Sequence, residues 1–416
     1  MSAGHYAGGE ILFIAHRLPF PPDRGDKIRS HHLLKALAAL APVHVATFAD
    51  DEADFAAEGD LAALAASYCL VRRSKPLPLA GVEALARGLP VSVTAFHSAA
   101  LAAYVKRLCA SGRVGTIVVF SGQMGHYVPA DWRGRLVVDF VDVDSAKFAA
   151  YAQAKGPVKG WIDAREARLL AAEEEALARR AHASLLVSEE EAALFRAGLS
   201  PVARATAHVR ALANGIAADH YDPALVAPEP GLVALPGLRL IFTGQMDYAP
   251  NVAACLRAAQ RILPLVRAEI PGASFHVVGR NPPEALLALH GRDGVHVWGR
   301  VDDIRTWLKG ADLALVPLEI ARGIQNKVLE AMAMELPVVA SPGAATGIAA
   351  RAGEHLAVGE SDADLAAEVV RLARDPAAAR AMGRAARGFV VAKQSWAGVL
   401  ADLPQILAGR ASADAA

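Results

Sequence analysis

The chain has 416 residues, of which 54% are hydrophobic, and alanine supplies most of the surplus. Lysine plus arginine and aspartate plus glutamate each number 43, so the formal net charge is zero and a general attraction to nucleic acid is excluded. There is no uncharged apolar run of about 18 residues, and the N-terminus lacks the basic and apolar regions of a signal peptide. We therefore expect a cytoplasmic protein without a transmembrane helix.

Short apolar runs alternate with helical patterns along the whole chain. The expected strands are 11–15, 43–48, 116–120, 136–141, 184–188 and 207–212 in the first half, and 238–244, 274–279, 295–299, 313–318 and 337–341 in the second. These runs are nearly continuous, which is typical of parallel strands covered by helices on both faces. Because the chain is too long for one ordinary domain, each half is predicted to be a doubly wound α/β domain.

A proline-rich stretch at 222–237 separates the two halves and is interpreted as a linker. We predict a Rossmann-like domain at 1–225, a linker at 226–237 and a second Rossmann-like domain at 238–395. Residues 396–416 are predicted to form a C-terminal helix able to pack back on the first domain, followed by a frayed tail. The carboxyl ends of the strands would then meet at a shared cleft, a favoured place for a ligand.

The loop after the first expected strand is the first candidate site. Gly25 allows backbone to approach a ligand closely, and a helix begins near Asp26, which can cap it. Free amides at that helix start, with Lys27 or Arg29 nearby, could hold an anion. A helix cap with solvated basic residues explains the same pattern equally well.

The second candidate site follows the strand at 136–141. Asp142, with Asp144 and Ser145, could bind sugar hydroxyls or accept a proton there, and a helix cap is the alternative interpretation. His126, in the loop after the strand at 116–120, could act as a base, but a single histidine in a loop is more often structural or solvated, and that is the interpretation preferred here. The three cysteines match no metal-ligand spacing and no third ligand accompanies the two aspartates, so we predict no metal site.

The second domain begins with a strand, a glycine loop and a helix start. Gly244 closes the strand, Gln245 follows it, and Asn251 opens the next helix after Pro250. This arrangement receives phosphate in many α/β proteins, and a simple βα turn is the alternative.

A second such loop follows the strand at 313–318. Arg322 and Gly323 lie in the exit loop, and Asn326, Lys327 and Glu330 lie on the helix after it. Lys327 and Glu330 are three residues apart and could form an exposed ion pair contributing under about 1 kcal/mol. The functional interpretation is that helix-start amides, Arg322 and Lys327 surround a diphosphate, while Glu330 accepts hydrogen bonds from ribose hydroxyls.

In their order and spacing, several segments resemble family 4 glycosyltransferases of the GT-B fold, which has two Rossmann-like domains facing a cleft. The segments are 19–37, 184–195, 212–223, 240–251, 297–318 and 326–341. VDFVDVDSAKF, FTGQMDYAPN and ARGIQNKVLEAMAM are similar to sugar transferases associated with exosortase/PEP-CTERM exopolysaccharide systems. The resemblance covers nearly the whole chain.

The resemblance implies a retaining, metal-independent glycosyltransferase of the hexosyltransferase type, active in exopolysaccharide biosynthesis. The donor would be a UDP- or GDP-linked sugar held by the second domain, and no further cofactor is implied. A glycan or polyprenyl-linked acceptor would be held mostly by the first domain. A peripheral contact with the inner membrane stays open, through Arg72, Arg73 and Lys75 or through 155–161, and a solvated surface explains those residues equally.

Site residues are carried over from the family by position. Glu330 matches the second glutamate of the E-x7-E motif, the one expected on the ribose, and Gly25 matches the glycine near the donor phosphates. Asp142 falls where many relatives place a histidine near the sugar.

At three positions expected to contact the donor diphosphate, this sequence differs from the family pattern. Arg322 stands where the first glutamate of E-x7-E is expected, Gln245 stands where an arginine is usual, and no lysine occurs near Asn251. We infer that Arg322 and Lys327 supply the positive charge instead.

Two other functions are compatible with this architecture. A nucleotide-sugar 2-epimerase would need acid and base groups around the sugar, and the family 4 segments argue against it. A non-catalytic GT-B module that binds a partner or a polysaccharide stays open because the E-x7-E motif is altered.

Overall fold

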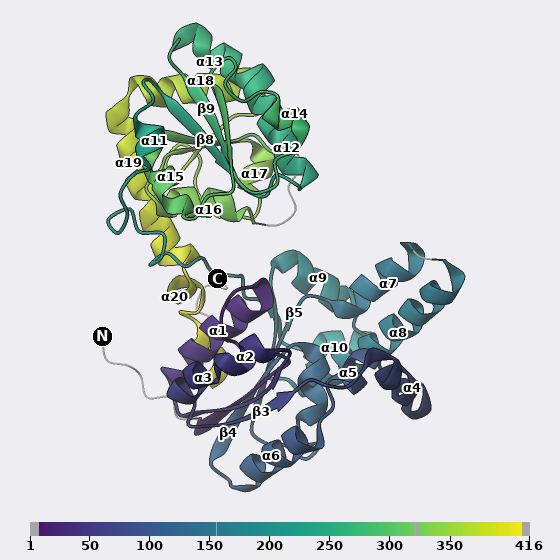
Figure 1. The fold of residues 1–416 in the computed structure, drawn as a ribbon. Coiled ribbons are helices and arrows are strands. Elements are labelled where there is room, and N and C mark those ends of the chain that lie inside the picture. The colour runs from purple at the N-terminus through teal and green to yellow at the C-terminus, as the bar shows by residue number, and fades with distance from the viewer. Residues whose placement is uncertain (1–7, 155, 320–323, 410–416) are drawn as a thin grey trace. The chain divides into compact units, whose positions relative to one another are not determined.

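The computed structural model describes residues 8–154, 156–319 and 324–409. The chain divides into two compact units, each with its own parallel sheet (Figure 1). Unit 1 takes the residues up to Asn214 together with those from Leu400, and unit 2 takes Gly215–Val399. No helix of the described residues is long and apolar enough to cross a membrane.

Unit 1 is built on a seven-stranded parallel sheet with the order β3-β2-β1-β4-β5-β6-β7. Its strands are β1 (Glu10–Ala15), β2 (Val43–Ala49), β3 (Ser67–Arg72), β4 (Val114–Phe120), β5 (Arg135–Val141), β6 (Ala183–Leu186) and β7 (Val209–Ala211). Every residue of β2 is buried, as expected for a strand covered on both faces. The edge strand β3 was not predicted, because its sequence SYCLVR mixes polar and apolar residues and it is only half-buried.

The strand order of unit 1 reverses direction between β1 and β4. Right-handed crossovers therefore place α1–α3 on one face of the sheet and the helices after β3 on the other. The helices are α1 (Gly25–Ala38), α2 (Glu52–Ala56), α3 (Glu58–Leu64), α4 (Leu77–Arg87), α5 (Val91–Ala95), α6 (Ala99–Ala110), the 3₁₀ helix η1 (Gly122–Tyr127), α7 (Asp144–Ala154), α8 (Pro157–Arg180), α9 (Glu189–Gly198), α10 (Pro201–Thr206) and α21 (Leu403–Ala408).

Unit 2 has a six-stranded parallel sheet with the order β10-β9-β8-β11-β12-β13. Its strands are β8 (Arg239–Thr243), β9 (Ser274–Val278), β10 (Val295–Gly299), β11 (Leu313–Val316), β12 (Val338–Ala340) and β13 (Ala357–Val358). The order reverses between β8 and β11, and in such sheets ligands bind beyond the carboxyl ends of the strands at that reversal.

The helices of unit 2 alternate with its strands (Figure 1). They are α11 (Pro230–Val233), α12 (Ala249–Arg257), the π-helical turn η2 (Ala258–Ile262), α13 (Leu263–Glu269), α14 (Glu284–Leu287), α15 (Ile304–Gly310), α16 (Asn326–Ala333), α17 (Pro342–Ala345), α18 (Asp362–Arg374), α19 (Pro376–Phe389), the π-helical turn η3 (Val390–Gln394) and α20 (Trp396–Val399).

The predicted linker at 226–237 is part of unit 2. It contains helix α11, whose Leu232 is fully buried in the unit 2 core. Ile216 and Ala218 are buried in the same core, so the chain changes unit before the boundary predicted at 225. Despite the prolines of this stretch, Leu232 packs into the core, because burying its side chain is favourable.

Candidate functional site

Three adjacent strands of unit 2 end in a glycine with a positive φ. Gly244 directly follows β8 with φ 154°, Gly279 directly follows β9 with φ 159°, and Gly299 is the last residue of β10 with φ 72°. A Cβ on Gly279 would lie only 1.6 Å from the carbonyl oxygen of Gly244, so no other residue fits there without moving the loop. The glycines thus allow the loops after β8 and β9 to lie in direct contact.

Backbone hydrogen bonds join the three loops to one another. The amide of Gly244 donates to the carbonyl oxygen of Val278 (3.1 Å), and the amide of Gly279 donates to that of Gly299 (2.8 Å). The amide of Met246 donates to the carbonyl oxygen of Arg280 (2.9 Å). The loops after β8, β9 and β10 therefore form one connected rim at the carboxyl end of the sheet.

Lys327 connects helix α16 to this rim. Its Nζ donates to Oδ1 of Asn251 (2.9 Å) and more weakly to Oε1 of Gln325 (3.4 Å). Asn251, buried on α12, in turn donates from Nδ2 to the carbonyl oxygen of Gln245 (2.8 Å). Burial lowers the pKa of Lys327. Hydrogen bonds to Asn251 and Gln325 hold the ammonium group of Lys327, and the predicted ion pair with Glu330 does not.

Glu330 lies on α16 one turn after Lys327. It is half-buried, and burial raises the pKa of its carboxyl group, while a hydrogen bond from the Tyr221 hydroxyl acts in the opposite direction. Burial also raises the pKa of Tyr221, so this hydroxyl stays a donor at neutral pH. The Arg387 guanidinium donates to the carbonyl oxygen of Tyr221 (2.8 Å) and fixes that residue. Glu330 keeps acceptor capacity for a ligand, since a carboxylate has about four acceptor positions.

These loops surround a cavity of about 500 Å³ within unit 2, which we call the rim pocket. It is lined by Tyr221, Thr243, Gly244, Gln245, Asn251, Val278, Gly279, Arg280, Arg300, Val301, Ile304, Ile324, Asn326, Lys327 and Glu330. Six of the residues predicted from the sequence meet here, namely Gly244, Gln245, Asn251, Asn326, Lys327 and Glu330. The other two predicted residues of this region, Arg322 and Gly323, lie outside the described residues.

Sequence reasoning missed Tyr221, Arg280 and Arg300 as lining residues. Both arginines are exposed, and within the described part of the chain neither guanidinium is paired with a carboxylate. Each directly follows a glycine that ends a strand, Gly279 or Gly299. That repeated Gly-Arg pair at a strand end was the signal that could have found them.

In unit 1, Gly25 is the first residue of α1, and a Cβ on it would meet nothing within 4 Å. Asp26 does not cap the helix as predicted, because the N-cap position belongs to Arg24. Its carboxylate instead accepts from Arg17 Nη1 (2.6 Å). Hydrogen bonds from His16 and Arg17 lower the pKa of Asp26, so it is ionised at neutral pH.

The two cations predicted to hold an anion near Gly25 are both buried. Lys27 is paired with the buried Asp54, and the Arg29 guanidinium donates to both carboxylate oxygens of Asp139, at 2.9 and 3.2 Å. The positive charges of Lys27 and Arg29 are thus paired with buried carboxylates, and the two pairs join α1 to α2 and to β5. The anion-binding prediction for Lys27 and Arg29 is therefore wrong.

Asp142 is exposed just beyond β5, where the backbone is strained. Val141, which ends β5, has φ 69°, and Ser121 after β4 has φ 74°, both rare for residues with a Cβ. The adjacent cavity, lined by Asp142, Asp144 and Glu174 among others, has a volume of about 10 Å³, room for a water molecule at most.

Glu174 on α8 is buried beside Asp142 and Asp144, and it holds the start of α7. Its carboxylate accepts from the backbone amide of Ser145 (3.0 Å) and from the Ser145 hydroxyl. Burial raises its pKa from 4.5 to about 7. The folded protein consequently keeps a proton that the unfolded chain releases between pH 4.5 and about 7.

Stability is expected to fall as pH rises through this window, because the unfolded state binds fewer protons there. The Glu174 contribution is about 3 kcal/mol at 1.36 kcal/mol per pKa unit. In Glu174→Gln, which stays neutral and keeps an acceptor for Ser145, this part of the decline should disappear from the free energy of unfolding measured against pH. In the control Glu175→Gln the decline should persist, since hydrogen bonds from Ser200 lower the pKa of Glu175. Equal slopes in wild type and Glu174→Gln would contradict the assignment.

His126 has a structural role, as the sequence suggested. Its Nδ1 lies 2.7 Å from the carbonyl oxygen of Gln123, and its ring centroid lies 4.0 Å from that of Tyr127. Burial lowers its pKa to about 4, so it is neutral at physiological pH. In the described ranges no group of three or more His, Cys, Asp or Glu residues is placed to hold a metal ion.

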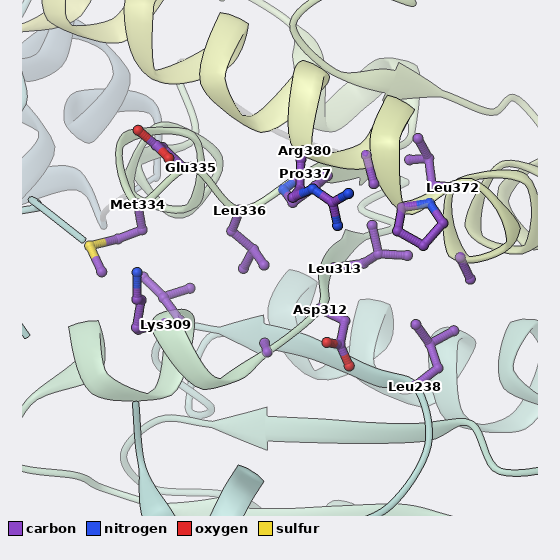
Figure 2. Close-up of a pocket in the computed structure, with 15 residues that line it drawn as sticks. Leu238, Lys309, Asp312, Leu313, Met334, Glu335, Leu336, Pro337, Leu372 and Arg380 are labelled. Atoms are coloured by element: carbon purple, nitrogen blue, oxygen red, sulfur yellow. The ribbon is translucent and has the colours of Figure 1, made fainter. Parts of the chain in front are cut away.

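Unit 2 has a second cavity of about 380 Å³ at the amino end of its sheet (Figure 2). Leu238, Leu313 and Pro337, which stand at the starts of β8, β11 and β12, line it together with Lys309 and Arg380. Ligands of open α/β sheets bind at the opposite, carboxyl end. None of the predicted site residues lies here, so the rim pocket is the candidate functional site.

The sequence of unit 2 matches a known family over residues 237–375, described as glycosyl transferases group 1. No curated protein matches the sequence at a significant level. Among solved structures, sucrose-phosphate synthase from Thermosynechococcus elongatus is similar over 96% of this chain and 98% of that chain, with 19% identity and a TM-score of 0.55.

Two further solved structures are similar over almost their whole length. HepE from Anabaena, in complex with UDP and glucose, matches over 96% of this chain and 99% of that chain, with 15% identity and a TM-score of 0.55. WaaG, a glycosyltransferase involved in lipopolysaccharide biosynthesis, matches over 96% and 100%, with 19% identity and a TM-score of 0.52. The predicted α/β fold is therefore confirmed: the chain has the two-domain GT-B fold, and residues 237–375 within it match the glycosyl transferases group 1 family.

Proposed function

We propose that the protein is a retaining glycosyltransferase that moves a sugar from a nucleotide-sugar donor, UDP- or GDP-linked, to a glycan or polyprenyl-linked acceptor. The observation that carries the proposal is the rim pocket, which brings glycine loops, a helix start, cations and a half-buried carboxylate to one place. The match of residues 237–375 to glycosyl transferases group 1 supports it, because this segment holds most of the pocket lining.

The donor diphosphate would lie against the glycine loops and the start of α16. Helix α16 begins at Asn326 with no side-chain cap, so its first amides face the pocket region with the positive end of the helix dipole. Glu330, about one helical turn further, would accept hydrogen bonds from ribose hydroxyls. Tyr221 would hold the Glu330 carboxylate in position while doing so.

The positive charge of the pocket comes from unusual positions for the family. Gln245 and Asn251 replace the expected arginine and lysine, yet the Nζ of Lys327 lies within 2.9 Å of Asn251. Lys327 on α16 would thus place a positive charge beside Asn251 on α12, the position where the family is expected to have a lysine. Arg280 and Arg300 add two unpaired guanidinium groups, among the described residues, to the lining. We propose that these three cations share the role assigned from the sequence to Arg322 and Lys327.

These cations would stabilise the leaving group. The bond between the anomeric carbon and the diphosphate oxygen breaks, and its electron pair stays on that oxygen, where Lys327 and the α16 amides offset the charge. An acceptor hydroxyl attacks the same face of the sugar and passes its proton to the departing oxygen, so the configuration is retained. This sequence needs neither a metal ion nor a protein nucleophile, in line with the metal-independent reaction inferred from the family.

Unit 1 would hold the acceptor, with Asp142 as its candidate polar contact. Gly25 and Asp142 follow β1 and β5 at the carboxyl end of the unit 1 sheet, the end favoured for ligands. A role in exopolysaccharide biosynthesis, in the cytoplasm or at the inner membrane, extends the resemblance to exosortase-associated transferases.

The decisive experiment is a nucleotide-release assay of the full chain with a panel of UDP- and GDP-linked sugars. We expect release from one nucleotide class, and in Glu330→Ala we expect KM for that donor to rise about tenfold, since a charge-assisted hydrogen bond contributes about 1.5–3 kcal/mol. Glu368→Ala is the control, because Glu368 lies on α18 of the same unit, outside the rim pocket, and pairs only with Arg371 of its own helix among the described residues.

Two contrary outcomes would indicate another function, and a third would concern Glu330 alone. Conversion of the donor into its sugar epimer, without release of nucleotide, would indicate the 2-epimerase. Failure of every nucleotide to raise the melting temperature would indicate the non-catalytic module. Equal KM values in Glu330→Ala and wild type would remove Glu330 from the donor site.

A further inference from the structure

Arg387 on helix α19 joins two backbone segments that carry residues of the rim pocket. Helix α19 packs against α16 in unit 2 (Figure 1). A single guanidinium nitrogen of Arg387, Nη1, donates to the carbonyl oxygen of Tyr221 (2.8 Å) and to that of Ala333 (2.5 Å), the last residue of α16. Its Nη2 lies 2.9 Å from Oδ2 of Asp222. Arg387 thus holds the backbone at Tyr221 against the end of the helix that carries Glu330.

A second arginine holds the same segment from helix α15. Nη1 of Arg305 donates to the carbonyl oxygen of His220 (3.0 Å). Arg305 is itself held by Asp303, whose carboxylate accepts from its Nε (2.9 Å) and its Nη2 (2.7 Å). Two consecutive backbone carbonyl groups, those of His220 and Tyr221, are therefore bound by guanidinium groups from two different helices. This arrangement fixes the point from which the Tyr221 side chain extends.

The Tyr221 hydroxyl donates a hydrogen bond to the Glu330 carboxylate. Burial raises the pKa of Glu330, whereas this hydrogen bond and the nearby charge of Lys327 act in the opposite direction. Both contacts thus favour the ionised carboxylate, which only accepts hydrogen bonds. Because Glu330 also lines the rim pocket, its remaining acceptor positions are placed before a ligand arrives.

A carboxylate held in this way discriminates between sugars of the nucleotide. Ribose offers two neighbouring hydroxyl donors, whereas 2′-deoxyribose lacks one of them. A site built to accept from a hydroxyl rejects the analogue without it, because the half-buried acceptor is then left unpaired. We infer that Arg387, acting through Tyr221 and Glu330, makes the rim pocket selective for ribonucleotide donors over 2′-deoxyribonucleotide donors such as thymidine-diphosphate sugars.

The inference rests on the proposed function, because it narrows the donor class of the same pocket. Arg387 is not among the described residues that line the rim pocket, so it is a positioning residue. Both Tyr221 and Arg387 also lie outside residues 237–375, the segment that matches glycosyl transferases group 1. They are 166 residues apart in the chain, so no local pattern links them.

The test is calorimetric titration of the full chain with UDP, GDP and their 2′-deoxy forms. We expect wild type to bind the ribonucleotide of its preferred base about tenfold to a hundredfold more tightly than the 2′-deoxy form. In Tyr221→Phe and in Arg387→Met this ratio should fall at least about threefold, with the affinity for the 2′-deoxy form almost unchanged. A general loss of structure would weaken both forms equally. Tyr221→Phe keeps the ring, so it tests the inference even where Arg387→Met lowers the melting temperature.

Two matched controls are available in the same unit. Arg384→Met removes the same charge from α19, and Tyr248→Phe removes the same hydroxyl; both residues are exposed and lie outside the rim pocket. The selectivity of these variants should equal that of wild type. In a Glu330→Gln background, Tyr221→Phe should have no further effect, because Tyr221 acts through Glu330.

The pH dependence of binding reports on the hydrogen bond itself. Without the Tyr221 hydroxyl, the pKa of Glu330 should rise further above its ordinary value. On acidification, Tyr221→Phe should therefore lose its affinity for the ribonucleotide at a higher pH than wild type does. A purely structural role of Tyr221 would leave this pH unchanged.

Equal selectivity for ribose in wild type and Tyr221→Phe would overturn the inference, and so would equal binding of ribonucleotide and 2′-deoxy form by wild type. If Glu330→Ala still weakens nucleotide binding in that case, the proposed function stands without the inference. An effect of Tyr221→Phe that Arg387→Met does not share would overturn the role of Arg387. If wild type binds no nucleotide, the proposed function fails and the selectivity fails with it.

Discussion

Replacing Lys327 by methionine is expected to lower kcat/KM for the nucleotide-sugar about tenfold to a hundredfold. The change removes one charge-assisted contact, and such a contact contributes about 1.5–3 kcal/mol. The loss should appear mainly in kcat if Lys327 stabilises the leaving diphosphate more than the bound donor. Steady-state kinetics with the donor identified by the release assay measures both constants.

A matched control is available on the opposite side of unit 2. Lys309 lines the cavity at the amino end of the sheet (Figure 2), so Lys309→Met removes the same charge from the same unit without touching the rim pocket. Its kinetics should equal those of wild type. If Lys327→Met left nucleotide affinity and turnover unchanged, Lys327 would have no role beyond its hydrogen bond to Asn251.

Arg29→Met should be the most destabilising single change considered in unit 1, by about 3–5 kcal/mol, because it leaves the charge of Asp139 buried without a partner. Both side chains are almost completely buried, and Arg29 also donates to the carbonyl oxygen of Ala213 (3.2 Å) and to Asn214 Oδ1 (3.0 Å). Arg29 therefore joins α1, β5 and the end of the first segment of unit 1, at Ala213 and Asn214. Urea denaturation, monitored by circular dichroism, measures the loss.

Two further variants separate charge burial from loss of packing. Arg29→Met/Asp139→Asn should recover much of the stability, since no unpaired charge is left and the new side-chain amide would keep an acceptor for the Val141 backbone N–H. Arg239→Met breaks a bidentate pair with Asp312 that is partly exposed, and such pairs contribute about 0–1 kcal/mol. Equal losses in Arg29→Met and Arg239→Met would show that burial of the pair does not matter.

Local patterns in the sequence were enough to find most strands and the rim pocket. Continuous apolar runs predicted all the strands except β3 and β13, the first half-buried and the second of only two residues. The strand–glycine–helix pattern placed Gly244, and helical spacing placed Lys327 and Glu330 on one helix. These features depend on neighbours within a few residues, which a single sequence displays.

The same reasoning failed where a side chain's partner is distant in the chain. Arg29 looked like a solvated cation near a ligand loop, but its carboxylate partner lies 110 residues away on β5. The linker looked unstructured because of its prolines, yet Leu232 packs into the unit 2 core.

The sequence by itself determined that the protein has two parallel α/β units, that a glycine loop and a helix follow β8, and that a helix with Lys327 and Glu330 follows β11. Strand period, glycine position and helix spacing depend on residues that are close together in the sequence, so the sequence alone displays them. Only the tertiary structure decided which cations are available: Lys27 and Arg29 are used in buried pairs, whereas Lys327, Arg280 and Arg300 line the rim pocket. Lys327 meets Asn251 across 76 residues of chain, and no local pattern specifies which distant side chains will meet once the sheet is formed.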